Sequence, residues 1–402
     1  MKILMINVVC GIRSTGRICT DLATALEAQG HDVKIAYGRE NVPDNYQKYA
    51  VRIGSDLDVK LHALKARLFD GCGWGSVKAT KKFIDWIIDY NPDVIHLHNI
   101  HGYYINIELL FNYLKICNKK IIWTLHDSWA FTGHSAYCDV VGCERWKNGC
   151  YNCPNKKIYP KSLIDRSKVN WLKKKELLTN IQNFMIITPS EWLANLVKKS
   201  FLYNYETIVI HNGIDTSQFC YSPSDVRNRL QISDTQCMLL GVSTSWDEMK
   251  GLSDYFKLAN LLGEEYQIVL VGLTKSQING LPHNIIGIER TNSVKELAEL
   301  YSACDIFLNL SYCENYPTVN LEALACGATV ITYNVGGSSE TVRNVDNGYT
   351  IDRGDINAVK NLLIESKNLI ASQKLSAVDL RLIDKKECVS KYLYYINEYS
   401  LT

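Results

Sequence analysis

The chain has 402 residues, of which 47% are hydrophobic and 21% charged, and its formal net charge is +2. This length is enough for two domains with separate cores, and the composition is typical of a globular protein. The balanced charge and the lack of a recognisable binding module argue against a nucleic-acid-binding protein. No apolar run approaches the roughly 18 residues that a transmembrane helix needs.

The first apolar segment, Lys2–Val9, predicts a buried strand. It is too short for a lipoprotein signal, and Val9 stands where such a signal carries a small residue before its cysteine. We therefore expect a cytoplasmic protein. The strand runs into a loop with Gly11 and Gly16, and an amphipathic helix is predicted from about Arg17 to Gln29.

This loop matches neither a dinucleotide fingerprint nor a P-loop. Its glycines would still let a ligand approach the backbone at a helix N-terminus, with Arg13 or Arg17 near a phosphate. Further on, Asp56 and Asp58 have the spacing of a metal-binding Asp-x-Asp motif, but no strand precedes them. Because a helical pattern follows, we interpret them as helix-capping residues.

Histidines gather at the ends of the next predicted strands. His96 and His98 alternate onto one face of a strand, and His101 follows its end. No carboxylate or cysteine stands at ligand spacing, so polar lining of a cleft is favoured over zinc binding. His126 and Asp127 end the strand at 121–125, where a doubly wound sheet keeps its site, although a buried core histidine is the alternative for His126.

A cysteine cluster follows, with the spacing C-x4-C-x6-C-x2-C at Cys138, Cys143, Cys150 and Cys153. In a cytoplasmic protein this pattern indicates a structural zinc site that holds an irregular insertion. Free thiols or a redox pair are the open alternative. Most of the fourteen cysteines stand singly in apolar surroundings, which indicates core packing.

The segment Lys156–Lys175 carries eight basic residues and one acidic residue, interleaved with apolar side chains. A basic amphipathic stretch of this kind predicts a surface for anionic lipid, here the inner face of the plasma membrane. A solvated helix face is the alternative interpretation.

The strand–helix alternation recurs after residue 206 and predicts an α/β protein of two doubly wound, Rossmann-like domains facing a central cleft. We place the first domain at 1–205, with the cysteine insertion at 138–153, and the second at 206–383. The C-terminal stretch 384–402 predicts an amphipathic helix that packs back on the first domain.

Two carboxylates flank a predicted helix start in the second domain. The apolar run 306–310 predicts a strand, and Pro317 disfavours helical geometry before it, so the next helix starts at or just after this proline. Glu314 lies in the loop and Glu322 in the helix. Carboxylates at such a position suit the hydroxyl groups of a sugar or a ribose.

This arrangement resembles the glutamate pair of retaining glycosyltransferases of family 4, which have the GT-B fold. The motifs that carry the resemblance span nearly the whole chain: the Gly11–Gly16 loop, Pro92-Asp-Val-Ile-His, Asn212-Gly-Ile-Asp, Lys250-Gly, Glu322-Ala-Leu-Ala-Cys-Gly and Gly336-Gly. His126-Asp-Ser-Trp and the cysteine insertion are similar to a subgroup that builds bacterial capsule, colanic-acid-like and O-antigen polysaccharides.

The resemblance implies roles for individual residues. Glu322 would hold the nucleotide ribose, Glu314 a donor-sugar hydroxyl, and Lys250 the diphosphate. His126 would contact the donor sugar. Backbone groups for the sugar and diphosphate would come from Asn315, Tyr316, Pro317 and Thr318, with Gly11, Gly16 and Arg17 closing from the other domain. Acceptor-side candidates are His98, His101 and Asp127.

One position departs from the family pattern, because Ser245 stands where an arginine is common. Arg17 or Arg290 would then have to assist Lys250, or phosphate binding is weaker. The resemblance implies a metal-independent hexosyltransferase that uses a UDP- or GDP-sugar and a lipid-diphosphate-linked glycan. A sugar-nucleotide 2-epimerase and a non-catalytic scaffold at the membrane are the alternatives.

Overall fold

The computed structural model describes residues 1–343, 346, 348–373 and 379–397. It divides the chain into two compact units, Met1–Ile210 with Val389–Thr402, and His211–Cys388. The boundaries expected from the sequence, after residues 205 and 383, lie slightly before these. Among the described residues, no helix has the length and apolar character needed to cross a bilayer.

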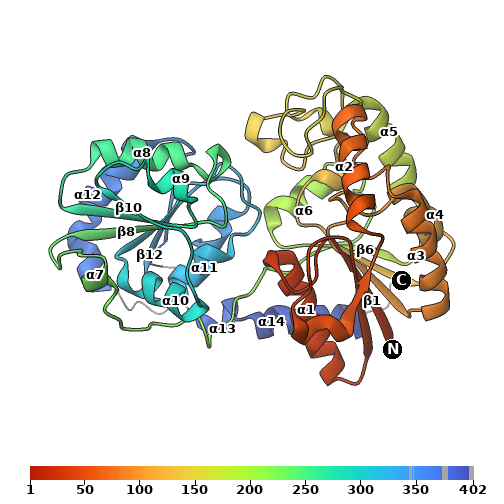
Figure 1. The fold of residues 1–402 in the computed structure, drawn as a ribbon, viewed down its shortest axis with the longest axis horizontal. Helices are drawn as coiled ribbons and strands as arrows, with labels where there is room; N and C mark the ends of the chain where they lie inside the picture. The colour runs from red at the N-terminus through yellow and green to blue at the C-terminus, as the bar shows by residue number, and fades with distance from the viewer. Residues whose placement is uncertain (344–345, 347, 374–378, 398–402) are drawn as a thin grey trace. The chain divides into compact units, whose positions relative to one another are not determined.

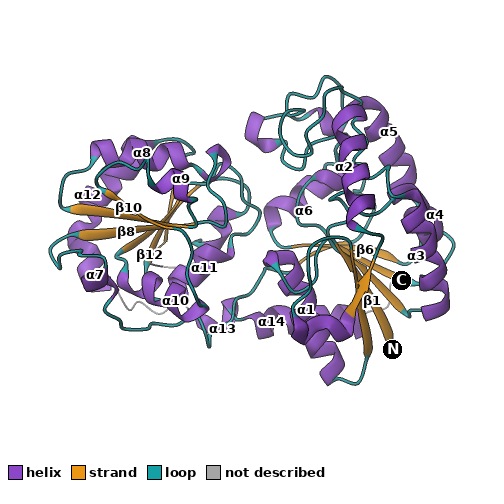
Figure 2. Cartoon of the chain, viewed as in Figure 1, coloured by secondary structure: helices purple, strands orange, loops and turns teal. Residues whose placement is uncertain are grey.

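The first unit is built on a seven-stranded sheet whose order is β3-β2-β1-β4-β5-β6-β7, with every neighbouring pair parallel. Its strands are β1 (Lys2–Asn7), β2 (Asp32–Tyr37), β3 (Ala50–Arg52), β4 (Val94–Leu97), β5 (Lys120–Thr124), β6 (Phe184–Thr188) and β7 (Thr207–Val209). Helices lie on both sides of the sheet (Figure 2). They are α1 (Arg13–Ala28), α2 (Asp56–Phe69), α3 (Val77–Tyr90), α4 (Ile107–Leu114), α5 (Ser167–Leu178), α6 (Glu191–Lys198) and, from Val389 on, α14 (Lys385–Asn397), which begins in the second unit.

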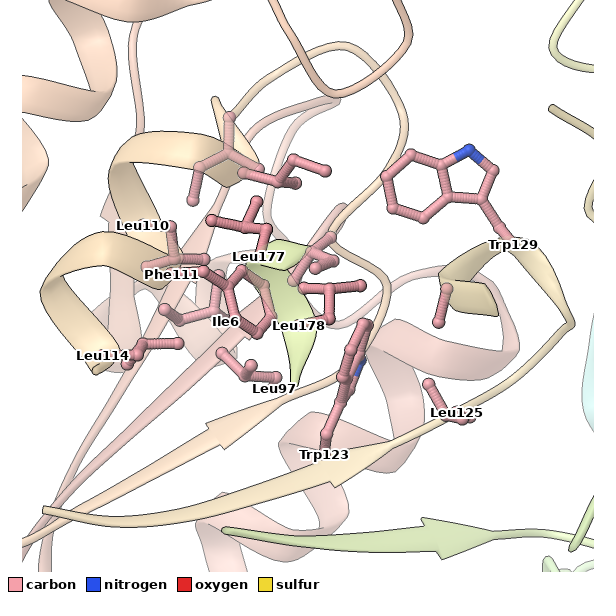
Figure 3. Packing of buried hydrophobic residues seen from close by; sticks show 14 of the residues in the cluster. Ile6, Leu97, Leu110, Phe111, Leu114, Trp123, Leu125, Trp129, Leu177 and Leu178 are labelled. Carbon is pink, nitrogen blue, oxygen red and sulfur yellow. The ribbon is translucent and has the colours of Figure 1, made fainter. Parts of the chain in front are cut away.

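The core of the first unit explains the continuous apolar runs of its strands. Parallel strands that are covered on both faces bury every side chain, as β4 and β6 do. Figure 3 shows part of this core, where Phe111 from α4 packs against Trp123 from β5 at 5.5 Å between ring centroids. The indole N–H of Trp123 donates to the carbonyl of His98 at 2.9 Å, so its polar group is also satisfied.

The second unit has a six-stranded parallel sheet in the order β10-β9-β8-β11-β12-β13. Its strands are β8 (Cys237–Val242), β9 (Tyr266–Val271), β10 (Ile285–Ile288), β11 (Ile306–Asn309), β12 (Thr329–Tyr333) and β13 (Gly348–Ile351). Its helices are α7 (Val226–Arg229), α8 (Leu252–Leu261), α9 (Lys275–Ile278), α10 (Val294–Ala303), α11 (Thr318–Ala325), α12 (Ile356–Gln373) and α13 (Leu380–Ile383) (Figure 1).

Strand order locates the functional edge of each sheet. The order reverses between β1 and β4 in the first unit and between β8 and β11 in the second. In open parallel sheets, ligands bind outside the carboxyl ends of the strands at this switch point, because the following helices leave in opposite directions. The segments after these four strands are therefore where a site is expected.

Two helix starts test the sequence interpretation. Helix α2 begins at Asp56 with a capping box, in which the Ser55 hydroxyl accepts from the Asp58 N–H and the Asp58 carboxylate accepts from the Ser55 N–H. This confirms the capping role of the Asp56-Leu-Asp58 stretch. Helix α1 begins at Arg13, earlier than the predicted Arg17, so Gly16 and Arg17 lie inside the helix and not in the loop before it.

Candidate active site

The loop between β11 and α11 forms the centre of the site in the second unit. Helix α11 begins at Thr318, directly after Pro317, as predicted. Pro317 has no N–H and a φ of −71°, which suits the residue that precedes a helix. No side chain caps this helix start. The Asn320 N–H donates to the Pro317 carbonyl at 3.2 Å, so the earlier N–H groups of the first turn and the positive end of the helix dipole are the groups that could receive an anion.

Lys250 and Glu314 meet at this loop, although they are far apart in the sequence. The Lys250 Nζ lies 2.6 Å from the Glu314 Oε1, and the two side chains are 34% and 15% exposed. Burial acts to lower the pKa of Lys250, but the charge of Glu314 and its hydrogen bond outweigh burial and leave the pKa raised. The lysine is therefore a fixed positive charge at the loop that leads into α11.

The backbone before α8 holds Lys250 in place. The Asp247 carboxylate accepts from the Lys250 N–H at 3.0 Å and caps the short 3-10 turn Glu248–Lys250. Gly251 follows with a φ of +72°, and a Cβ there would lie 2.0 Å from the Leu310 carbonyl oxygen. Only glycine fits this close approach of the two chain segments, which explains the Lys250-Gly251 pair.

Glu322 projects from α11 toward α10. The hydroxyl of the buried Tyr301 donates to the Glu322 Oε2 at 3.0 Å. Burial raises the pKa of Tyr301, and the neighbouring Glu322 charge raises it further, so the phenol stays a hydrogen-bond donor. Tyr301 thus orients one carboxylate oxygen of Glu322. The sequence did not indicate Tyr301, because its partner lies on another helix.

A buried polar network fixes α11 against its sheet, and sequence reasoning missed it. The Asn320 side chain is fully buried and accepts from the Asn309 Nδ2 at 2.9 Å. Its own Nδ2 donates to the Thr341 hydroxyl at 2.8 Å. Leaving one such buried group unpaired costs about 1–3 kcal/mol, so the network ties the end of β11, the start of α11 and the turn at 338–341 together.

The sequence led us to expect Arg17 or Arg290 as a second cation beside Lys250, and the structure adds a different one. Ser245 lies in an exposed turn and exchanges hydrogen bonds with Ser243, and Arg290 is exposed in the loop after β10. Arg343 is a further cation beside the loop. Burial and the Glu340 charge raise the pKa of Tyr316, whereas the Arg343 charge opposes them, which places Arg343 near this tyrosine.

In the first unit, the histidines cluster at the ends of β4 and β5. The His98 Nδ1 lies 3.2 Å from the His126 Nε2, and the His101 Nε2 lies 2.8 Å from the Asp127 Oδ2. The other ring nitrogen of His101 lies 3.0 Å from the Tyr159 hydroxyl. The structure thus joins His98, His101, His126 and Asp127 in one cluster, and it adds Tyr159, which the sequence did not indicate.

Burial separates the roles within this cluster. His96 and His98 are completely enclosed, and the His98 Nε2 has no hydrogen-bond partner. These two histidines therefore do not line a surface, contrary to the sequence interpretation, and the His98 ring contacts His126 through its Nδ1. Burial lowers the pKa of His126 to about 4, so the imidazole is neutral at neutral pH. A neutral ring can donate one hydrogen bond and accept another.

The loop after β1 also follows a switch-point strand. The Gly11 N–H donates to the Gly16 carbonyl at 3.1 Å, and Gly11 has a φ of +75°. Arg13 pairs with Glu40, with 2.6 Å between the Arg13 Nη2 and the Glu40 Oε1, and α1 has no side-chain cap. Arg17 is exposed on the first turns of the helix.

The cysteine cluster lies in the first unit. The pKa of Cys150 is raised to about 11 and that of Cys153 to about 12, mainly by burial and in part by the charges of the neighbouring cysteines of the cluster. The four thiols are therefore neighbours, and all are free cysteines. Across the described ranges, no three His, Cys, Asp or Glu side chains are grouped closely enough to hold a metal ion. The thiol chemistry suits zinc, but the arrangement in this structure is not a formed tetrahedral site.

The chain matches two family models. Residues 15–218 match the model described as "Glycosyltransferase Family 4", and residues 225–374 match "Glycosyl transferases group 1". The chain belongs to glycosyltransferase family 4. Its two parallel-sheet units form the GT-B fold of this family, as the resemblance implied.

Several relatives and solved structures are similar to this family 4 glycosyltransferase. The putative colanic acid biosynthesis glycosyl transferase WcaC of Escherichia coli is 24% identical over 369 residues, which cover 89% of this chain and 88% of the relative. The N,N'-diacetylbacillosaminyl-diphospho-undecaprenol alpha-1,3-N-acetylgalactosaminyltransferase of Campylobacter jejuni is 25% identical over 52% of this chain and 58% of its own length.

Among solved structures, sucrose-phosphate synthase of Thermosynechococcus elongatus superimposes with a TM-score of 0.73 at 19% identity, covering 99% of this chain and 98% of the other. HepE of Anabaena in complex with UDP gives a TM-score of 0.67 at 16% identity, covering 99% of this chain and all of the other. At these identities the structures establish the shared fold. The glycosyltransferase is thus related in sequence to enzymes of colanic acid and undecaprenol-linked glycan synthesis.

Proposed function

We propose that this glycosyltransferase moves a hexosyl group from a UDP- or GDP-sugar to a lipid-diphosphate-linked glycan, with retention of anomeric configuration. The reaction would serve bacterial surface polysaccharide synthesis, such as O-antigen, capsule or exopolysaccharide. The observation that carries the proposal is the Lys250–Glu314 pair, 2.6 Å apart, in the loop that leads into the uncapped start of α11. The names of WcaC and of the undecaprenol-linked transferase support the choice of pathway and acceptor.

The geometry of the second unit supports the donor roles that we propose. A diphosphate needs positive charge and N–H donors, which Lys250 and the backbone around Thr318 supply. The Glu314 carboxylate would give up part of its contact with Lys250 and accept a hydrogen bond from a sugar hydroxyl. Glu322, oriented by Tyr301, would accept hydrogen bonds from the ribose hydroxyls. UDP and UDP-glucose bound to HepE support a nucleotide-sugar donor.

The chemistry is the departure of a nucleoside diphosphate from the sugar. Negative charge develops on the leaving phosphate, and Lys250 with the α11 terminus would stabilise it. Asp56 and Asp58 belong to a helix start, so we assign this electrostatic task to the lysine and the helix rather than to a metal held by them. We assign no carboxylate as nucleophile: the acceptor hydroxyl would form the new bond to the anomeric carbon on the face that the diphosphate leaves, and its proton would pass to the departing phosphate. This front-face displacement gives the α-linked product from an α-linked donor. His126 of the first unit is proposed to contact the donor sugar.

A panel of UDP- and GDP-sugars, assayed with a polyprenyl-diphosphate glycan, tests the proposal. We expect one donor to give an α-linked product by NMR, at a rate that EDTA does not change. A β-linked product from an α-linked donor contradicts retention. Conversion of the donor without any acceptor would instead indicate the 2-epimerase, and no reaction with any donor would favour the scaffold.

We also propose that Cys138, Cys143, Cys150 and Cys153 hold structural zinc when the metal is present. Their spacing and their mutual proximity support this assignment. We expect the purified protein to contain about one zinc ion per chain by mass spectrometry. A Cys150→Ser variant should lose the metal, whereas Cys117→Ser, outside the cluster, should keep it. A metal-free wild-type protein with four titratable thiols in this segment would contradict the assignment.

A further inference from the structure

Helix α2 carries an apolar stripe that the described residues of its own unit leave exposed. Leu57, Leu61, Leu64 and Leu68 are 64%, 58%, 54% and 37% exposed. At 100° per residue these four positions lie within about 60° of one another around the helix. The opposite side of α2 faces the unit, where His62 and Ala66 are buried. A stripe of exposed leucines costs solubility unless a partner covers it.

Basic side chains border this stripe on both sides. Lys60 and Arg67 lie on one flank and Lys65 on the other, by the same helical geometry, and all three are exposed. The acidic residues Asp56 and Asp58 are confined to the first turn, where Asp58 caps the helix. The charge along the rest of the stripe is therefore positive.

The basic segment at 156–175 extends this surface. The Leu163 N–H donates to the Arg67 carbonyl at 2.8 Å, and the Arg166 N–H donates to the Asp70 Oδ2 at 2.9 Å. These bonds hold the segment beside the C-terminal end of α2, as Figure 1 shows for α2 and α5. Exposed apolar side chains on the segment and at the helix end are Phe69, Leu163, Ile164, Val169 and Leu172.

Six of the eight basic residues of the segment are exposed, Lys156 is half-buried and Lys174 is buried. Lys174 is buried, and its Nζ donates to the Trp129 carbonyl at 2.7 Å and the Thr132 carbonyl at 3.1 Å. The exposed basic residues are Lys157, Lys161, Arg166, Lys168, Lys173 and Lys175. The single acid, Asp165, accepts from the backbone N–H groups of Cys153 and Ser167. Burial acts to raise its pKa, but these bonds outweigh burial and lower the pKa, so Asp165 is one negative charge among the six exposed cations.

We propose that the leucine stripe of α2 and the adjoining segment 161–173, together called the leucine–lysine face, dock on a bilayer that contains anionic lipid. Apolar side chains that enter the headgroup region, flanked by lysine and arginine, are the combination that interfacial helices use. The exposed charges of this face are almost all positive, which suits an anionic lipid surface. A protein partner would not require such an excess of positive charge. The inference rests on the proposed function, which requires a lipid-linked acceptor.

The same segment connects this face to the histidine cluster. Tyr159 lies at its start, and the Tyr159 hydroxyl lies 3.0 Å from the His101 Nδ1. A glycan attached to a lipid in the bilayer would thus reach the acceptor-side candidates along the segment that touches the membrane. The leucine–lysine face would hold the enzyme where its acceptor is, rather than take part in the chemistry.

Co-sedimentation of the full-length protein with vesicles tests the docking. One set of vesicles is phosphatidylcholine alone, and the other is phosphatidylcholine with phosphatidylglycerol. We expect the wild-type chain to pellet with the anionic set, and both the Leu61→Gln/Leu64→Gln and the Lys60→Gln/Arg67→Gln variants to bind at least about tenfold more weakly. Matched controls are Ile116→Gln, at an 80% exposed site of the same unit, and Lys198→Gln on α6, which should bind as wild type.

The vesicle assay contains neither donor nor acceptor, so its outcome is independent of glycosyl transfer. Hydrolysis of the donor in solution should be the same in the wild type and in the face variants, which also shows that they are folded. Wild-type protein that stays in the supernatant with both vesicle sets overturns the proposal and assigns the stripe to a protein partner. Equal binding by the face variants and the controls overturns it as well. Vesicle binding without any sugar transfer would contradict the proposed function alone.

Discussion

Replacing Lys250 with alanine is expected to lower kcat/KM for sugar transfer by about 10²–10³-fold. The lysine is the positive charge held 2.6 Å from Glu314 in the loop before α11, where we propose that the leaving diphosphate gains negative charge. The loss should appear mainly in kcat, because the interaction strengthens as charge develops. Steady-state kinetics with the donor identified by the panel measures it.

The Lys250→Ala substitution should change the stability of the protein very little, so a loss of activity can be attributed to catalysis and not to unfolding. Lys250 is one-third exposed, and a partly exposed ion pair is worth only about 0–1 kcal/mol. The Tm of Lys250→Ala should therefore stay close to that of the wild type. Lys275→Ala, an exposed lysine on α9 of the same unit, is the matched control and should keep full activity. A Lys250→Ala enzyme with wild-type kinetics would remove the observation on which the proposed function depends.

The first unit is expected to lose several kcal/mol of its free energy of unfolding as the pH falls from about 6.5 to 4. Burial lowers the pKa of His96 to about 3 and the pKa values of His62 and His126 to about 4. An unfolded histidine has a pKa of about 6.5, so the unfolded chain binds these protons first. Each proton bound only by the unfolded chain costs about 1.4 kcal/mol per pH unit.

The sign follows from the direction of the shifts. Above pH 6.5 these histidines are neutral in both the folded and the unfolded chain, so the free energy of unfolding has its full value. As the pH falls toward the folded-state pKa values, only the unfolded chain binds these protons, and the free energy of unfolding decreases. Chemical denaturation at a series of pH values, followed by tryptophan fluorescence, measures this loss. Only Trp246 of the eight tryptophans lies in the second unit, so the signal reports mostly on the first.

A substitution isolates the contribution of one ring. His96 is buried with its Nδ1 unpartnered, and its Nε2 lies 2.8 Å from the Thr124 hydroxyl, which donates to the Tyr392 hydroxyl of α14. His96→Leu should flatten the pH dependence below 6.5, while His283→Gln, at an exposed site, should leave it unchanged. A wild-type stability that is level between pH 7 and 4.5 would show that these histidines are not enclosed as the structure has them.

Local signals in the sequence determined the fold class and several element boundaries. Apolar runs and their periodicity reflect burial on one or both faces of an element, so they predicted the alternating strands and helices of both units. Pro317 restricts the backbone next to it, which is why the start of α11 could be predicted. The short, half-buried strands β3 and β13 gave no such signal, because an edge strand of a few residues has no clear pattern.

The contacts that define the site came only from the tertiary structure. Glu314 and Glu322 were found from their spacing, but the sequence could not pair Glu314 with Lys250 or Glu322 with Tyr301. These pairs join segments that approach because β8 and β11 are neighbours at the switch point and α10 and α11 pack side by side. The direction in which a side chain points also depends on the tertiary structure. From the sequence we included Lys174 in a basic surface, whereas the fold buries this lysine against the Trp129 ring.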